Sequence, residues 1–216
     1  MILFDFRSQL ADNPLPGGTT TLLFVHTPRT GGTSVRQALI SCGHYNSMLY
    51  VAKAYNPQED LDHRDNKFNP HLDYRSVSLE LLENVYSISF VRNPWDRFVS
   101  WYRYSNSELT FDRFVRVKLG LEPEPEGKRN SNRERNPSTQ EAYWLHSDLV
   151  FRFEDLESEV RRLADLLYLK LHLKWLNGSR SLQEQHKGYR DYYDPETVRL
   201  VAEAEEPTIS TFGYEF

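Results

Sequence analysis

The sequence predicts an α/β fold in which a central parallel sheet is flanked by helices. The prediction rests on three segments of the same kind. Short apolar runs at residues 21–26, 85–91 and 149–153 are each followed by apolar residues at helical spacing. Because strands and helices alternate, successive strands are expected to pair in parallel. With 216 residues, of which 39% are hydrophobic, the chain is predicted to form one domain over residues 1–216.

The first of these segments follows a loop at residues 11–20, where Pro and Gly cluster. Residues 21–26 form a short apolar run that is typical of a buried strand. Pro28 and the pair Gly31-Gly32 interrupt this run, and a helical pattern begins at Thr33. The expected unit is therefore strand, glycine-rich turn and helix.

The second segment repeats this unit, because Asn93-Pro94 ends the apolar run at 85–91. Asn93 is a favourable N-cap and Pro94 suits the first position of a helix. Further helices are expected at 140–146, 154–168 and 195–205. Polar stretches predict surface loops at 55–75, 122–138 and 177–190, and residues 122–138 are expected to be mobile.

Composition excludes several classes of function. A formal net charge of -5 argues against a nucleic-acid partner. The single cysteine, Cys42, allows no intramolecular disulfide and fits a reducing compartment. The first ten residues lack a basic start followed by a long apolar run, and no run of about eighteen apolar residues occurs, so neither a signal peptide nor a membrane span is expected. We expect a cytoplasmic protein; the sequence does not indicate its oligomeric state.

The glycine-rich turn between the first strand and helix has the composition of an anion-binding loop. Backbone N–H groups at a helix start point outward, and glycines let the backbone close around a tetrahedral anion. The candidate binding residues are Arg29, Thr30, Gly31, Gly32, Thr33 and Ser34. The loop is not a Walker P-loop, since it lacks the Lys before Ser/Thr. Taken alone, it is equally compatible with an ordinary strand-to-helix turn.

A second candidate anion site follows the strand at 85–91. Arg92 comes directly after this strand, and Ser100 lies about two turns inside the next helix. These two side chains can flank a phosphate. The alternative is that Arg92 pairs with Asp96 and that Ser100 only packs.

The pair of motifs FVHTPRTGGTS and FVRNPWDRFVSWY resembles the two signatures by which sulfotransferases bind 3′-phosphoadenosine 5′-phosphosulfate (PAPS). In particular, the chain resembles the branch that contains the heparan sulfate 2-O- and 6-O-sulfotransferases and bacterial relatives. Weaker likeness extends from about residue 21 to the C-terminus, through residues 151–156, 176–179, 189–193 and 212–214. The resemblance implies a three-layer fold like that of P-loop NTPases and transfer of a sulfuryl group from PAPS, which leaves PAP.

The resemblance also implies a role for individual residues. The first loop, residues 30–34, would hold the 5′-phosphosulfate, and Arg92 and Ser100 would hold the 3′-phosphate. Lys187 and Arg190 are further candidates for phosphate contacts. Where this chain has Arg29, relatives usually carry a lysine that contacts the leaving phosphate oxygen; arginine keeps the charge but has a different shape.

The acceptor needs a general base, and a neutral histidine is suited to this near pH 7. Of seven histidines, His71 lies where relatives resembling the 2-O-sulfotransferases place a catalytic histidine. His63 is the reserve candidate, and His26 is expected to be structural. A solvated loop histidine is the alternative for His71.

Two other functions remain open at this stage. One is a kinase-like phosphotransferase, although the Gly-Lys-Ser/Thr signature and an acidic magnesium-binding strand end are missing. The other is a non-catalytic PAP-binding module. For the sulfotransferase, a carbohydrate or small-metabolite acceptor is favoured over a peptide, no metal is expected because PAPS is already activated, and no membrane partner is expected.

Overall fold

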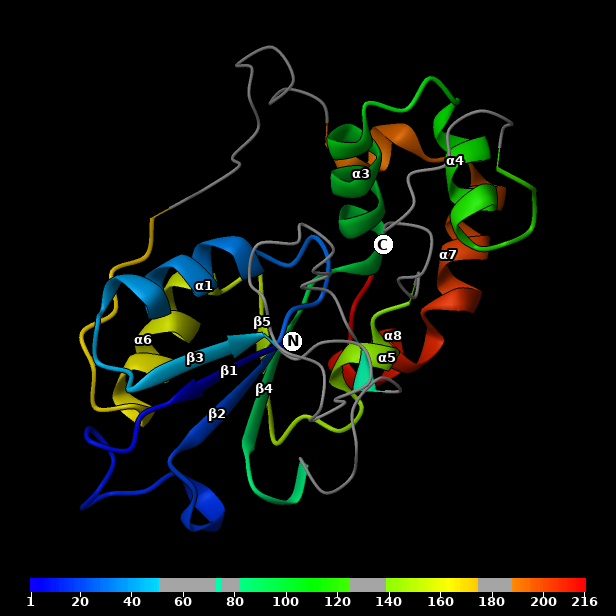
Figure 1. Cartoon of the computed structure of the whole chain (residues 1–216). Helices are drawn as coiled ribbons and strands as arrows, with labels where there is room; N and C mark the ends of the chain where they lie inside the picture. Colours follow the sequence, from blue (N-terminus) through cyan, green and yellow to red (C-terminus); the bar gives the residue numbers. More distant parts are fainter. Residues whose placement is uncertain (51–72, 75–81, 125–138, 175–187) are drawn as a thin grey trace. The chain divides into compact units, whose positions relative to one another are not determined.

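The structure is a computed structural model (Figure 1). It describes residues 1–50, 73–74, 82–124, 139–174 and 188–216. The chain divides into two compact units, which are described separately. The first unit comprises Met1–Val91 and Ala142–Lys174, and the second comprises Arg92–Glu141 and Trp175–Phe216.

The first unit is built on a five-stranded sheet with the strand order β3-β1-β2-β4-β5. Its strands are β1 (Ile2–Asp5), β2 (Thr21–Val25), β3 (Ser47–Tyr50), β4 (Tyr86–Val91) and β5 (Leu149–Arg152). β2, β4 and β5 are parallel, with Val25 opposite Ser89 and Val91 opposite Arg152. β1 runs antiparallel to both of its neighbours.

The predicted α/β fold with flanking helices is therefore confirmed, with one correction: the sheet is mixed rather than wholly parallel. The exception has a local cause. No helix of the α type lies between β1 and β2, so the chain returns to the same end of the sheet and the two strands pair antiparallel. Parallel neighbours need a crossover connection. The connection from β2 to β4 is such a crossover, and it contains α1 (Gly32–Ser41).

One face of the sheet is covered by α1 and α6 (Leu156–Leu166) (Figure 1). The apolar residues of α6 recur every three or four positions and form one stripe, as the sequence predicts. They pack on alternate residues of the strands, such as Phe24 and Phe90. The buried residues of this stripe and its continuation are Leu156, Val160, Leu163 and Leu167. The opposite strand face buries a smaller cluster of Met1, Leu23, Val25, Tyr74 and Tyr143.

The second unit is helical. Its elements are α3 (Pro94–Ser105), α4 (Phe111–Lys118), a 3-10 turn η4 (Tyr189–Tyr192), α7 (Pro195–Ala204) and α8 (Glu206–Phe212). α3 contacts α4, α7 and η4. The interface between α3 and α4 is aromatic: the ring of Tyr102 lies 5.4 Å from that of Phe111 and 5.3 Å from that of Phe114. Two short elements complete the chain, a 3-10 turn at Pro16–Gly18 and α5 (Glu141–Trp144).

Most predicted elements lie where the sequence places them. The strand at 149–153 is β5, and the helices at 154–168 and 195–205 are α6 and α7. The helix expected at 140–146 is limited to α5. The predicted loops at 55–75, 122–138 and 177–190 lie largely outside the described residues. Within the part of the chain that the structure describes, no helix has the length and apolarity needed to cross a membrane.

The carboxylate of Asp194 caps α7 and makes the unit's stability depend on pH. Asp194 Oδ1 accepts hydrogen bonds from the main-chain N–H of Thr197 at 2.7 Å and from its hydroxyl at 2.8 Å. These bonds to the charged form lower the pKa of Asp194. The cap therefore stabilises the fold above the ordinary aspartate pKa of about 3.9, and this contribution is lost as the pH falls through the lower folded-state pKa.

We expect Asp194→Asn to lower the free energy of unfolding at pH 7, where the charge is present, and to have a smaller effect near pH 3. Asparagine is itself a good N-cap, so the variant removes the charge and keeps the acceptor. Urea denaturation at the two pH values measures the difference. Asp12→Asn, a change at an exposed carboxylate, is the control. An effect of Asp194→Asn that is equal at both pH values would contradict the charge-based explanation.

Candidate functional site

The backbone of the loop between β2 and α1 enters the left-handed region twice. Arg29 has φ 69° and Gly31 has φ 77°, a region that residues other than glycine rarely adopt. The hydroxyl of Thr30 donates a hydrogen bond to the main-chain oxygen of Thr27 at 3.0 Å and closes the loop. Successive N–H groups around left-handed residues form the concave surfaces that bind anions.

The N-terminus of α1 adds to this surface. Gly31 is the N-cap, and it has no side chain with which to bond to the helix start. The main-chain N–H groups of Ser34 and Val35 donate to the oxygen of Gly31, at 2.9 and 3.2 Å. The first N–H groups of a helix, here those of Gly32 and Thr33, have no carbonyl partner within the helix, and the helix dipole gives them positive potential. An anion at this loop would meet these N–H groups.

Close packing behind the loop explains why it contains two glycines. A methyl group at Gly32 would overlap the ring atoms Cδ2 and Nε2 of His26. The His26 side chain is buried and stacks on Phe24, with ring centroids 5.6 Å apart. A methyl group at Gly31 would lie 3.0 Å from side-chain atoms of Phe153 and of Leu156. The backbone thus lies directly on the core of the first unit, and His26 is part of that core.

The polar side chains of the loop divide into buried and half-buried groups. Thr30 and Ser34 are buried, whereas Arg29 and Thr33 are partly exposed. Because the hydroxyl proton of Thr30 is donated to Thr27, this side chain serves the loop's own structure. What Thr30 can offer an anion is its main-chain N–H, not its hydroxyl proton.

In the second unit, Arg92 is the first residue after β4 and makes the ion pair that the sequence left as an alternative. Its Nη2 and Nε lie 2.7 and 2.8 Å from Oδ2 of Asp96. The Arg92 side chain is 14% exposed. A guanidinium has five N–H donors, so pairing with one carboxylate oxygen is compatible with binding an anion as well.

Ser100 lies on the same face of α3 as Asp96, because the two are four positions apart in the helix. The Arg92 guanidinium is bonded to Asp96, the residue one helical turn before Ser100. The start of α3 is fixed by Asn93, whose Oδ1 accepts from the N–H groups of Trp95 and Asp96 at 3.1 and 3.2 Å. This arrangement brings Arg92 and Ser100 to one side of a single helix.

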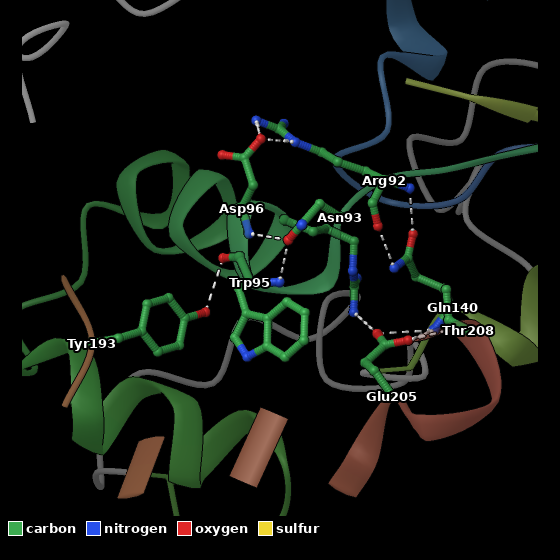
Figure 2. A network of polar contacts seen from close by, with 9 residues as sticks. Arg92, Asn93, Trp95, Asp96, Gln140, Tyr193, Glu205 and Thr208 are labelled. Atoms are coloured by element: carbon green, nitrogen blue, oxygen red, sulfur yellow. Dashed lines mark hydrogen bonds and ion pairs between the residues drawn. The ribbon is translucent and has the colours of Figure 1, made fainter. Parts of the chain in front are cut away.

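Sequence reasoning did not identify Gln140 and Glu205, which lie around Arg92 in the network of Figure 2. The side chain of Gln140 makes hydrogen bonds to both main-chain groups of Arg92. Glu205 in turn accepts hydrogen bonds from the N–H of Gln140. No local sequence pattern indicates these contacts, because Gln140 lies 48 residues from Arg92 and 65 residues from Glu205.

Of the remaining predicted residues, Arg190 makes contacts of its own, and others lie outside the described part of the chain. Arg190 is exposed; its Nη2 donates to the main-chain oxygen of Phe216 at 2.7 Å, and its guanidinium lies 5.6 Å from the ring of Tyr189. The candidate base His71, its reserve His63 and the candidate phosphate ligand Lys187 lie outside the described residues. Their roles stay predictions.

A strand, a glycine-rich loop and an uncapped helix start, as in β2 and α1, are typical of α/β proteins that bind phosphate groups at a helix N-terminus. Comparison with known families identifies which class of phosphate-binding protein this is. The model of the sulfotransferase family matches residues 18–211. The chain therefore belongs to the sulfotransferase family, whose members are enzymes that use PAPS as co-substrate.

Among solved structures, the chain is similar to a candidate steroid sulphotransferase of Arabidopsis thaliana, with 16% identity, coverage of 98% of this chain and 83% of that chain, and a TM-score of 0.44. No curated protein sequence matches the chain significantly.

Proposed function

We propose that the protein transfers the sulfuryl group of PAPS to a hydroxyl of a carbohydrate or small metabolite, as in the branch that contains the heparan sulfate 2-O- and 6-O-sulfotransferases. The observation that carries the proposal is the loop of residues 26–31 within a chain of this family: it has two left-handed residues and leads into a helix whose N-cap is a glycine. Such a loop suits the 5′-phosphosulfate.

Charge and hydrogen-bond donors decide which residues we assign to each part of PAPS. When bound, PAPS supplies an activated sulfuryl group, so the proposal includes no metal. The N–H groups of Gly32 and Thr33, together with Arg29, stabilise the negative charge that develops on the leaving phosphate oxygen. Arg92 and Ser100 bind the 3′-phosphate, with Lys187 and Arg190 as further ligands. His71 accepts the proton of the acceptor hydroxyl.

The test is calorimetric binding of PAP, AMP and ATP, followed by assays of PAPS consumption with sugar and small-alcohol acceptors. PAP differs from AMP only by the 3′-phosphate, so we expect PAP to bind at least about ten-fold more tightly, the range of one charge-assisted contact. Tighter binding of ATP than of PAP in the presence of magnesium would favour a phosphotransferase. Binding of PAP without consumption of PAPS by any acceptor would favour a non-catalytic module.

Replacing Arg29 with lysine tests the position of this residue. We expect Arg29→Lys to raise turnover of PAPS several-fold and to leave PAP affinity nearly unchanged, because the compact ammonium is the group that relatives place at the leaving oxygen. Arg7→Lys, at an exposed arginine of the same unit, is the matched control. If Arg29→Lys alters neither turnover nor affinity, Arg29 does not act at the leaving oxygen.

A further inference from the structure

Gln140 holds the main chain of Arg92 with both ends of its side-chain amide (Figure 2). Its Oε1 accepts the N–H of Arg92 at 2.9 Å, and its Nε2 donates to the main-chain oxygen of Arg92 at 2.9 Å. The orientation of the amide is fixed by this pairing, because an N–H needs an acceptor and a carbonyl needs a donor. The Gln140 side chain therefore bonds to both main-chain groups of Arg92, as the backbone of a neighbouring strand would.

Arg92 needs such a partner because it lies between two regular elements. β4 ends at Val91 and α3 begins at Pro94, so the N–H and C=O of Arg92 belong to neither element. Buried main-chain groups require partners from elsewhere, and here a side chain from a distant part of the chain supplies both. Gln140 is fully buried, so no solvent competes for these bonds.

Gln140 is itself anchored to a buried ion pair. Its main-chain N–H lies 3.2 Å from each carboxylate oxygen of Glu205. Glu205 pairs with Arg97 at 2.7 Å and accepts the hydroxyl of Thr208 at 2.8 Å. The side chains of Arg97 and Glu205 are both 0% exposed. Gln140 thus connects the main chain of Arg92 to a fully buried ion pair of the second unit.

We propose that Gln140 is a positioning residue that fixes the main chain of Arg92, and thereby directs its guanidinium at the 3′-phosphate of the co-substrate. The inference rests on the proposed function, in which Arg92 binds that phosphate. Arg92 is held at both ends: Asp96 binds its guanidinium, and Gln140 binds its main chain. A shift of this main chain moves the guanidinium relative to Ser100, so loss of the Gln140 bonds weakens recognition of the 3′-phosphate specifically.

The experiment compares the affinities of Gln140→Met for PAP and for AMP by calorimetry. Methionine is similar in length and has no hydrogen-bonding amide. We expect PAP affinity to fall about ten-fold, since hydrogen bonds that orient a charged ligand group are lost, and AMP affinity to change less than about two-fold. In an Arg92→Ala background, Gln140→Met should cause no further loss of PAP affinity, since the two residues act through one contact. Gln9→Met is the matched control, because Gln9 also donates to a main-chain oxygen, that of Tyr168, but in the first unit.

The outcomes separate this inference from the proposed function. If the unaltered protein binds PAP and AMP equally, there is no 3′-phosphate site, and both fail. If it prefers PAP and Arg92→Ala removes the preference, but Gln140→Met leaves it intact, only the role of Gln140 is wrong. Equal losses of PAP and AMP affinity would likewise indicate a purely structural role. Should Gln140→Met not fold, Gln140→Glu keeps the acceptor for the Arg92 N–H and replaces the donor to the Arg92 oxygen with a charged acceptor; unchanged preference for PAP would then overturn the inference.

Discussion

Replacing Gly32 with alanine is expected to abolish PAP binding and to lower the free energy of unfolding by about 3 kcal/mol, the upper part of the range for overpacked sites. The added methyl group would overlap the ring of His26, which is only 5% exposed and stacks on Phe24. Because the ring is buried, we expect the start of α1 to move away from it. The N–H groups of Gly32 and Thr33 move with it, which is why binding and stability are lost together.

Two variants separate this clash from a general effect of alanine. Among the described residues, a methyl group at Gly188 would meet Asp191 Oδ2 alone, at an ordinary 3.8 Å, so Gly188→Ala should change stability by less than about 0.5 kcal/mol. Combining His26→Ala with Gly32→Ala removes the overlapping ring, and the double variant should lose less stability than the two single changes added together. Chemical denaturation of the wild-type protein and of the four variants measures these differences. Wild-type stability and PAP affinity in Gly32→Ala would refute the close packing described for this loop.

The second large effect is expected at Glu205. Glu205→Gln should lower the free energy of unfolding by about 3–5 kcal/mol, because it leaves the charge of Arg97 buried without its counter-ion. The carboxylate also accepts from the N–H of Gln140 and from the hydroxyl of Thr208. A glutamine amide would turn its own NH₂ toward one of these donors. Both side chains of the ion pair are 0% exposed, so water cannot replace the lost contacts.

An exposed ion pair of α7, the helix that Glu205 follows, provides the control. Glu203 on α7 pairs with Arg199, and both side chains are 59% exposed. Glu203→Gln should therefore change the free energy of unfolding by less than about 1 kcal/mol. The double variant Arg97→Met with Glu205→Gln removes the unpaired charge and should lose less than the sum of the single changes. Equal effects of Glu205→Gln and Glu203→Gln in urea denaturation would contradict this account.

The elements that sequence reasoning missed have identifiable causes. α4 carries Phe111, Phe114 and Val115 at helical spacing behind the N-cap Thr110, so its signal is present in the sequence but is only eight residues long. α8 follows α7 directly, with Glu205 as the boundary residue of both helices. The sequence therefore predicts a single helix at 195–205 and no second helix after it. β1 and β3 have four residues each, too few for their periodicity to distinguish them from loop.

The sequence by itself determined the strand–loop–helix units, the glycine-rich loop at Pro28–Ser34 and the resemblance to sulfotransferases, because each depends on neighbouring residues. The match of the family model to residues 18–211 confirms the family. The sequence could also name Asp96 as a possible partner of Arg92, since four residues separate them.

Only the tertiary structure decided which distant side chains surround these motifs. The antiparallel course of β1, the packing of His26 under Gly32, and the chain of contacts from Arg97 through Glu205 and Gln140 to Arg92 all join segments that no local pattern connects. The physical reason is burial. A buried polar or main-chain group must find a partner, and the fold, not the spacing along the chain, determines which residue supplies it.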